Sequence, residues 1–192
     1  MKKRGLLIIM SGPSGVGKGT IREELMKKND LNLHYSVSMT TRGMRPGEVN
    51  GREYYFVSRE EFDQNIANDN LLEWAEFVGN RYGTPKDKVE KLRNEGKNVM
   101  LEIEVNGTAQ VLSKVQDDGV LSIFIAPPSL EELEKRLRGR GTESEEVIKS
   151  RVAKANHEFG FKNQYKFIVV NDDLDKAVDD VRQIILSAMK GE

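Results

Sequence analysis

The 192-residue sequence contains no cysteine, which excludes disulfide bonds, thiolate chemistry and cysteine-based zinc sites. It also lacks an excess of either charge, because 30 basic and 31 acidic residues leave a formal net charge of −1. This balance argues against a general nucleic-acid or membrane-surface binder. No apolar run is long enough to cross a membrane, and the run that follows the basic residues 2–4 is too short for a signal peptide. We therefore expect a soluble cytoplasmic protein with neither nucleic acid nor membrane as a partner.

Short apolar runs alternate with helical patterns along the chain. A length of 192 residues with 38% apolar residues predicts one domain that carries inserted segments. The apolar runs predict strands at residues 6–10, 99–105, 120–126 and 167–170. The helical patterns lie near residues 17–28, 107–115, 130–137 and 174–189. Capping boxes mark two helix starts, at residues 58–61 and 129–132. This alternation is typical of a parallel sheet with helices on both faces.

Two stretches interrupt the alternation. Residues 39–85 are rich in arginine, tyrosine and glycine and contain short apolar runs at 54–57 and 71–78. They predict a small antiparallel sheet inserted between core elements. Residues 136–156 form a polar, arginine-containing helical region, which is typical of a mobile cover over a site.

The glycine-rich run at residues 11–20 carries the strongest chemical signal. Gly12, Gly17 and Lys18 complete the G-x-x-x-x-G-K pattern of a phosphate-binding loop, with a strand before it and a helix after it. Glycines let backbone N–H groups surround a polyphosphate, and the helix start and the lysine add positive charge. Gly19 stands where a serine or threonine usually ligates Mg²⁺, and Thr20 follows one residue late. A plain glycine-rich turn is the alternative, but the flanking strand and helix favour phosphate binding.

Two glutamates follow the apolar core of the run at 99–105. Strand alternation places Glu102 and Glu104 on one face, at the C-terminal end of a buried strand. Ligands bind beside that end of the strands in open α/β sheets. A carboxylate there can hold Mg²⁺ through water, and two solvated glutamates are the alternative.

The turn after residue 40 places two arginines, Arg42 and Arg45, three residues apart. Guanidinium groups suit a second phosphate, to which Tyr54 and Tyr82 can donate hydroxyl hydrogen bonds. A solvated loop and half-buried strand aromatics are the alternatives.

Glu73 lies within the apolar run at 71–78, where alternation places Leu71, Ala75 and Phe77 on its face. A carboxylate on such a face needs a hydrogen-bonding partner.

Three arginines fall in the second interrupting stretch. Arg136 and Arg140 share a helix face if the helix extends that far, and Arg151 lies on the next predicted helix. They can close over a phosphate. A solvated surface of mixed charge is the alternative, since acidic residues surround them.

Seven ordered segments together resemble guanylate kinase, from residue 6 to near the C-terminus. They are GPSGVGKGT, SVSMTTRGMRPGEVNGREYYFV, LLEWAEFVGNRYGT, LEIEVNG, IFIAPPS, RLRGRGTESEE and VNDDLD. The resemblance implies an α/β fold with a P-loop core around a five-stranded parallel sheet, an inserted small mixed β subdomain that binds GMP, and a helical lid. It places the core at residues 1–37, 88–129 and 160–192, the insert at 38–87 and the lid at 130–159. It implies transfer of the γ-phosphoryl group of ATP to GMP, with Mg²⁺, giving ADP and GDP.

The resemblance also assigns each candidate residue to a substrate. For guanine it implies Ser38, Glu73, Thr84 and Glu104. For the GMP phosphate it implies Arg42, Arg45, Tyr54 and Tyr82. For ATP it implies Gly12, Pro13, Ser14, Gly15, Val16, Gly17, Lys18, Gly19 and Thr20, with Asn171 near the adenine. The arginines that would close over the phosphates, and act with Lys18 in transfer, are Arg136, Arg140 and Arg151.

Three residues depart from the pattern of the family. Thr84 replaces a common serine and keeps the hydroxyl. Glu104 replaces a common aspartate, so its guanine contact can shift or pass through water. Gly19 leaves the usual Mg²⁺ hydroxyl position empty, so Thr20 and Glu102 become the candidate metal ligands, directly or through water.

Base choice follows from the donor pattern of guanine. The carboxylate of Glu73 can accept hydrogen bonds from N1–H and N2–H, and the hydroxyls of Ser38 and Thr84 can donate to O6. No general base is required, because the acceptor is a phosphate oxygen that is already anionic.

Three other functions compete with this interpretation. The first is an inactive guanylate kinase-like module that binds a phosphorylated peptide, the second a GTPase, and the third a kinase for another monophosphate. The intact loop lysine and the lid arginines argue against the first, and the absence of an N-K-x-D motif argues against the second. The sequence leaves the number of subunits open, with a homo-oligomer as one option.

Overall fold

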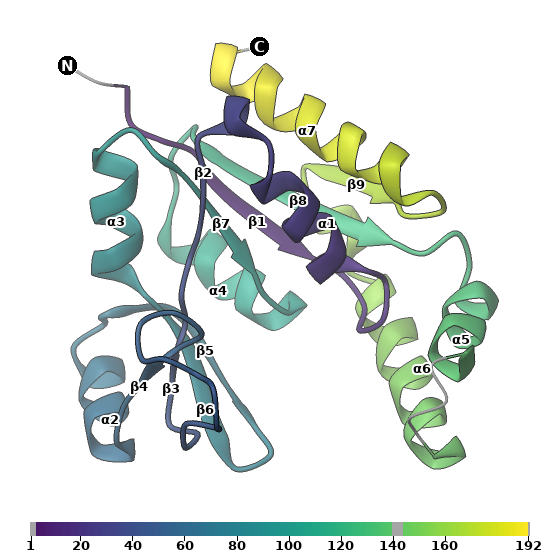
Figure 1. Cartoon of the computed structure of the whole chain (residues 1–192), viewed down its shortest axis with the longest axis horizontal. Coiled ribbons are helices and arrows are strands. Elements are labelled where there is room, and N and C mark those ends of the chain that lie inside the picture. The colour runs from purple at the N-terminus through teal and green to yellow at the C-terminus, as the bar shows by residue number, and fades with distance from the viewer. Residues whose placement is uncertain (1–2, 140–143, 192) are drawn as a thin grey trace.

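Five parallel strands form the main sheet of the computed structural model, in the order β2–β7–β1–β8–β9 (Figure 1). The structure describes residues 3–139 and 144–191, so the predicted site residue Arg140 lies outside the described residues. The strands are β1 (Leu7–Ser11), β2 (Leu33–Tyr35), β7 (Asn98–Glu102), β8 (Val120–Ala126) and β9 (Phe167–Val170). This confirms the five-stranded parallel sheet that the resemblance implied.

Helices cover both faces of this sheet (Figure 1). On one face lie α1 (Lys18–Met26) and α7 (Leu174–Lys190), and on the other α3 (Lys86–Asn94) and α4 (Val105–Lys114). The central strand β1 is fully buried, with Ile8 and Met10 packed toward the first pair of helices and Leu7 and Ile9 toward the second. A strand buried on both faces has a continuous apolar sequence, as this one does.

A second, smaller sheet has the order β4–β3–β6–β5. It consists of β3 (Met39–Thr40), β4 (Tyr55–Phe56), β5 (Leu71–Phe77) and β6 (Asn80–Pro85), with helix α2 (Arg59–Ala67) beside it. Strands β3 and β4 are parallel and the other pairs are antiparallel, so the sheet is mixed. The sequence pattern predicted an antiparallel sheet, which is wrong for the pair β3–β4. The mixed sheet that the resemblance implied is confirmed.

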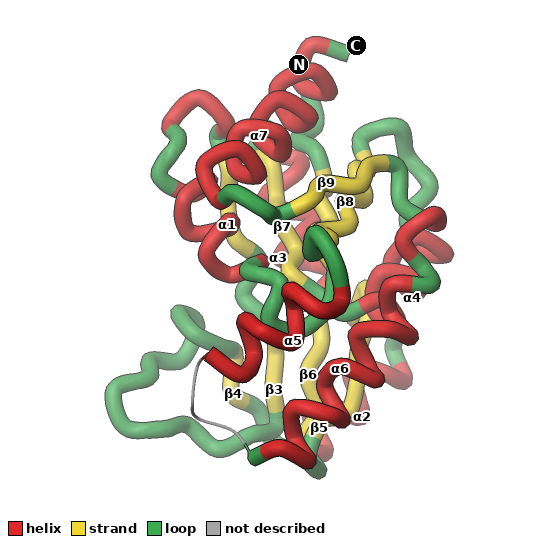
Figure 2. The backbone as a smooth tube through the Cα atoms, turned by 90° about the vertical axis from the view of Figure 1, so that its right-hand side faces the viewer, coloured by secondary structure: helices red, strands yellow, loops and turns green. Residues whose placement is uncertain are grey.

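The remaining elements are α5 (Leu130–Gly139), α6 (Glu145–Phe159) and two short 3₁₀ helices, η1 (Asn29–Leu31) and η2 (Lys162–Gln164). Helices α5 and α6 pack on each other and project from the same end of the main sheet as the small sheet does (Figures 1 and 2). Both predicted helix starts are confirmed: the hydroxyls of Ser58 and Ser129 accept from the N–H groups of Glu61 and Glu132, each at 3.1 Å. Within residues 3–139 and 144–191, no helix combines the length and apolarity needed to cross a membrane.

The strand predicted at residues 99–105 is wrong at its C-terminal end. Strand β7 ends at Glu102, and Glu104 is the N-cap residue of α4, whose carbonyl accepts from the N–H of Thr108 at 2.9 Å. The two glutamates therefore belong to different elements and do not share a strand face. The early helix start brings Gly107 against Glu73, where a Cβ atom would lie 2.8 Å from the carboxylate.

Arg93 is the largest fully buried side chain and joins three segments of the core. Its Nε donates to the carbonyl of Gly5 at 3.0 Å, and its Nη2 donates to Oδ1 of Asp117 at 2.7 Å. Its own carbonyl accepts from the N–H of Gly5 at 2.8 Å. The guanidinium lowers the pKa of the Asp117 carboxyl, which also accepts from the N–H of Gly119. Helix α3 is thereby fixed to the start of β1 and to the turn before β8.

We expect Asp117→Asn to lower the free energy of unfolding by about 1–3 kcal/mol at pH 7, because a buried guanidinium loses the nearer of its two carboxylate partners. The folded-state pKa of Asp117 is depressed, so its contribution is present above the unfolded pKa near 4 and is lost as the pH falls through the lower folded value. The difference between wild type and variant should therefore shrink in acid. Urea unfolding at several pH values measures it, with the exposed neighbour change Asp118→Asn as the control. Equal losses from both variants would contradict this account.

Candidate functional site

In the loop between β1 and α1, the backbone of Gly12 packs directly on the neighbouring strand β8. Gly12 has φ +142°, and a Cβ atom there would lie 2.2 Å from the carbonyl oxygen of Ile125 on β8. Gly17, at the N-cap of α1, has φ +97°. The Nζ of Lys18 turns back over the loop and donates to the carbonyls of Gly12 at 2.5 Å and Pro13 at 2.9 Å. The strand, loop, lysine and helix start predicted from the sequence are thus brought together in space.

Asn171, which follows β9, fastens this loop from the side. Its buried Nδ2 donates to the carbonyl of Val16 at 2.7 Å, and its backbone N–H donates to Ala126 at 2.8 Å. Its own carbonyl accepts from Nη1 of Arg136 at 2.8 Å. The resemblance places Asn171 near the adenine of ATP, and that role stays a prediction. The clamp on the loop is a role that sequence reasoning missed, since no local pattern shows the contact.

The charge of Lys18 sits in an acidic setting. Burial lowers the pKa of its ammonium, and the charges of Glu102, Glu158 and Glu104 act against that effect. Glu102 lies beside the loop: its Oε1 would be 3.9 Å from a Cβ atom on Gly19. Glu158, on α6, is a carboxylate that the sequence analysis did not select.

The candidate metal ligands come from two elements: Thr20 lies in the first turn of α1, and Glu102, at the end of β7, lies beside that turn. Oε2 of Glu102 lies 3.1 Å from Nε of Arg22, and Thr20 is exposed. The described part of the chain holds no group of three or more His, Cys, Asp or Glu side chains that could bind a metal by itself. One carboxylate beside a phosphate-binding loop fits Mg²⁺, which usually takes its other ligands from phosphates and water.

Glu73 on β5 is buried, with 6% of its surface exposed. Its Oε1 accepts from the hydroxyl of Thr84 at 2.6 Å, so the partner expected from the sequence is present. Burial raises the pKa of Glu73, and the Thr84 hydrogen bond lowers it. The predicted strand face is only partly correct, because the β5–β6 register shifts between Leu71 and Trp74, and Phe77 is 63% exposed.

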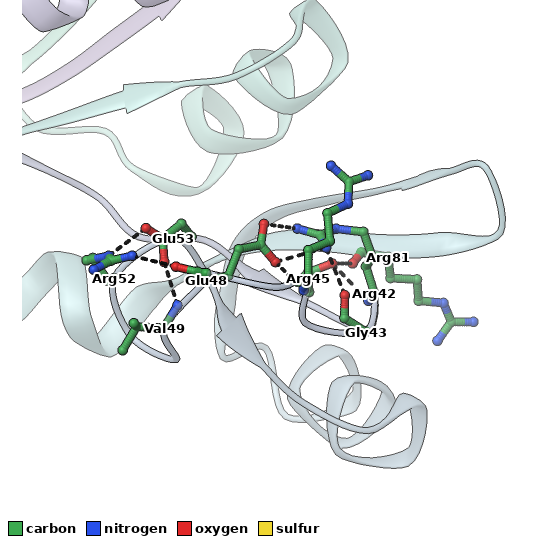
Figure 3. Close-up of polar contacts among 10 residues, drawn as sticks. Arg42, Gly43, Arg45, Glu48, Val49, Arg52, Glu53 and Arg81 are labelled. Atoms are coloured by element: carbon green, nitrogen blue, oxygen red, sulfur yellow. Dashed lines mark hydrogen bonds and ion pairs between the residues drawn. The ribbon is translucent and has the colours of Figure 1, made fainter.

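The arginine turn contains a partner that sequence reasoning missed (Figure 3). Glu48 accepts from both terminal nitrogens of Arg42, at 2.7 and 3.1 Å, and from the backbone N–H of Arg45 at 2.8 Å. The Arg42 guanidinium lies 5.4 Å from the ring centre of Tyr54, which packs edge-on against Tyr82. Hydrogen bonds to Arg42 lower the pKa of Glu48. The structure therefore brings Arg42, Tyr54 and Tyr82 together, and no local sequence pattern reveals the pair of Arg42 and Glu48.

The predicted cover residues contact the loop and its clamp. Arg136 on α5 reaches Asn171, and Nη1 of Arg151 on α6 lies 3.3 Å from the hydroxyl of Ser14 in the loop. Glu104 accepts from Nζ of Lys154 on α6 at 2.8 Å. Ser38 is half-buried, and its carbonyl accepts from the N–H of Tyr55 at 2.9 Å. Helices α5 and α6 thus contact the loop, while the small sheet lies on the other side of it in Figure 1.

Comparisons with known proteins agree on one family. The family described as guanylate kinase matches residues 4–188. A guanylate kinase of Mesoplasma florum is 54% identical over 186 residues, which is 97% of this chain and 62% of that protein, so this chain spans under two thirds of its length. A guanylate kinase of Bacillus subtilis is 50% identical over 187 residues, which is 97% of this chain and 91% of that one. The crystal structure of a guanylate kinase from Anaplasma phagocytophilum superposes with a TM-score of 0.74 at 33% identity, covering 97% of this chain and 87% of that one.

The close contact between the Gly12 backbone and β8 predicts the effect of Gly12→Ala. A methyl group there meets the Ile125 carbonyl, which cannot retreat without moving β8, and the backbone adopts a φ that alanine disfavours. We expect the free energy of unfolding to fall by about 1–3 kcal/mol. Urea unfolding measures the loss. Gly43→Ala is the control, because a Cβ atom at Gly43 meets no atom within 4 Å, and an equal loss there would refute the explanation.

Proposed function

Because the chain belongs to the guanylate kinase family, we propose that it transfers the γ-phosphoryl group of ATP to GMP, giving ADP and GDP. The observation that carries the proposal is the buried carboxylate of Glu73, held by Thr84 within the small sheet and separate from the phosphate-binding loop at Lys18. A loop on the main sheet for one polyphosphate and a carboxylate on the small sheet for a base suit a reaction with two nucleotides. These substrates associate the chain with purine nucleotide metabolism in the cytoplasm.

Guanine recognition follows from which groups still have protons to donate. In this structure the single hydroxyl proton of Thr84 is directed to Glu73, so Thr84 holds the carboxylate and cannot donate to O6 at the same time. Our expectation for Thr84 is revised accordingly. The carboxylate retains an oxygen for N1–H and N2–H, and the hydroxyl of Ser38 is the remaining candidate donor to O6. Adenine would present its N1 acceptor to the carboxylate and leave it unpaired, which a buried group tolerates poorly.

The phosphate of GMP is assigned to the arginine turn. Arg42 carries five N–H donors and uses two nitrogens on Glu48, so a phosphate would meet an already oriented guanidinium. Tyr54 and Tyr82, packed beside it, are in place to add hydroxyl donors. Arg45 contributes its backbone N–H to Glu48, and its side chain is the second cation of the turn.

ATP is assigned to the loop from Gly12 to Thr20. The ammonium of Lys18 lies over the loop carbonyls and would move onto the phosphates, where a negative charge satisfies it better than a carbonyl does. Glu102 and Thr20 would hold Mg²⁺ together with phosphates and water, and the bound ion would neutralise phosphate charge. Asn171 fixes the loop in position through Val16.

Transfer requires orientation and positive charge, and no general base. The attacking GMP phosphate oxygen is anionic at neutral pH, so no proton has to be removed. Lys18, Arg136 and Arg151 gather at or beside the loop and supply charge to the phosphoryl group in transit. The same role is proposed for Arg140. Approach of the cover formed by α5 and α6 would exclude water that otherwise hydrolyses ATP.

ADP formation with GMP, AMP, UMP and dTMP in parallel tests the proposal. We expect turnover with GMP alone, and we expect Glu73→Gln to lower kcat/KM for GMP by about 10²-fold, because the site loses a charged acceptor. Wild-type preference for another monophosphate would refute the assignment of the base. Absence of turnover with any of the four would favour the alternative, an inactive module that binds a phosphorylated peptide.

The Thr84 hydrogen bond predicts a change in pH dependence. Its donation lowers the pKa of Glu73, so Thr84→Val should raise that pKa further, and the carboxylate should become protonated at a higher pH. The acid limb of kcat/KM for GMP should therefore shift to higher pH, with a smaller loss at pH 8 than at pH 6. Thr84→Ser keeps the hydroxyl and serves as the control. A profile that drops equally at all pH values would show that the threonine acts only through shape.

A further inference from the structure

Lys154, on helix α6, makes a contact for which the proposed chemistry has no use. Its Nζ donates to Oε1 of Glu104 at 2.8 Å and lies 3.8 Å from Oε1 of Glu158, one turn further along the same helix. Glu104 is the N-cap residue of α4. The lysine thus ties a helix of the cover to the first turn of a core helix, far from it in sequence.

The carboxylate that Lys154 holds lies next to Glu73. Gly107, in the first turn after Glu104, packs directly on Glu73, where a Cβ atom would come within 2.8 Å of Oε2. The negative charge of Glu104 is also close enough to contribute to the raised pKa of Glu73. Glu104 therefore borders the part of the small sheet where the proposed function places guanine.

We propose that Lys154 is a positioning residue that couples helix α6 to the guanine subsite. Its ammonium pairs with Glu104, and when guanine takes that carboxylate the ammonium passes to Glu158. The inference rests on the proposed function, which assigns guanine to the Glu73 side of the site, and on the guanine contact that the resemblance implies for Glu104.

Glu158 is suited to receive the ammonium. It is buried, with 6% of its surface exposed, and its Oε2 has no hydrogen-bond partner among the described residues. The lysine already lies 3.8 Å from its other oxygen, so a rotation of the flexible side chain moves Nζ from one carboxylate to the other. The ammonium keeps a negative partner throughout the exchange, and the buried carboxylate of Glu158 exchanges a 3.8 Å contact with it for a hydrogen bond.

Competition for Glu104 links two events that occur on different elements. GMP that binds to the free protein must displace Lys154, whereas GMP that binds after α6 has moved away does not. Linkage is reciprocal, so a movement of α6 that releases Glu104 raises GMP affinity by the same factor by which GMP favours that movement. Guanine binding would thereby release one of the contacts that hold α6, the helix that carries Arg151, in this position.

Calorimetric titration with GMP, without ATP, tests the proposal in wild type, Lys154→Met and Lys149→Met. We expect Lys154→Met to bind GMP about two- to fivefold more tightly, the size expected for an exposed ion pair that no longer has to be broken. Loss of a positive charge alone would weaken binding of the GMP anion, so the sign is diagnostic. Lys149 is an exposed lysine on the same helix and controls for net charge.

The tightening should disappear when Lys154→Met is introduced into Glu104→Gln, because the competed carboxylate is then absent. Unchanged or weaker binding by Lys154→Met, equal tightening by Lys149→Met, or tightening that persists with Glu104→Gln would each overturn the coupling. Wild type serves to separate the two hypotheses. Failure of wild type to bind GMP would refute the proposed function, whereas wild-type binding with an unresponsive Lys154→Met would refute this inference alone.

Discussion

The close approach of the Gly12 backbone to the carbonyl of Ile125 is the constraint on which the site depends. With no side chain between them, the loop lies directly on β8. Asn171, which follows the neighbouring strand β9, donates to the carbonyl of Val16 in the loop. The carbonyl of Asn171 accepts a hydrogen bond from Arg136, and the hydroxyl of Ser14 within the loop accepts one from Arg151. One backbone contact thus determines where the loop, its clamp and two arginines of the cover meet.

Charge is balanced around this loop by carboxylates from separate elements. Glu102 ends β7, Glu104 begins α4 and Glu158 belongs to α6, and the charge of each acts on Lys18 against the effect of burial. These three negative charges oppose the lowering of the Lys18 pKa that burial causes. Because Glu158 belongs to α6, one of these charges comes from a helix outside the main sheet and its four covering helices.

Much of the fold could be predicted because its signals are local. The strands at 120–126 and 167–170 follow from continuous apolar runs, and the helix starts after Ser58 and Ser129 follow from capping boxes. Strand β2 has only three residues, too few for a period to show, and α3 is rich in charge with few apolar positions. The strand expected to extend to residue 105 stops at Glu102, and Gly107 in the first turn of the following helix packs against Glu73, a contact between residues 34 positions apart that no local pattern reveals.

In the candidate site too, some residues could be found from local sequence patterns and others could not. The loop residues are contiguous, so their chemistry is visible in one segment of sequence. Glu48, Glu158 and the clamp made by Asn171 act through partners that only folding brings near, and single residues of these types are common on surfaces.

The Arg42–Glu48 pair bears on how readily the arginine turn exchanges its occupant. A carboxylate presents two oxygens to the guanidinium in the fork geometry that a phosphate also presents, so the pair acts as an internal counterpart of a bound phosphate (Figure 3). Under the proposed assignment, Glu48 keeps the guanidinium paired and oriented whether or not a phosphate is bound to its remaining donors. On that assignment the turn accepts or releases a phosphate without leaving the charge of Arg42 unpaired.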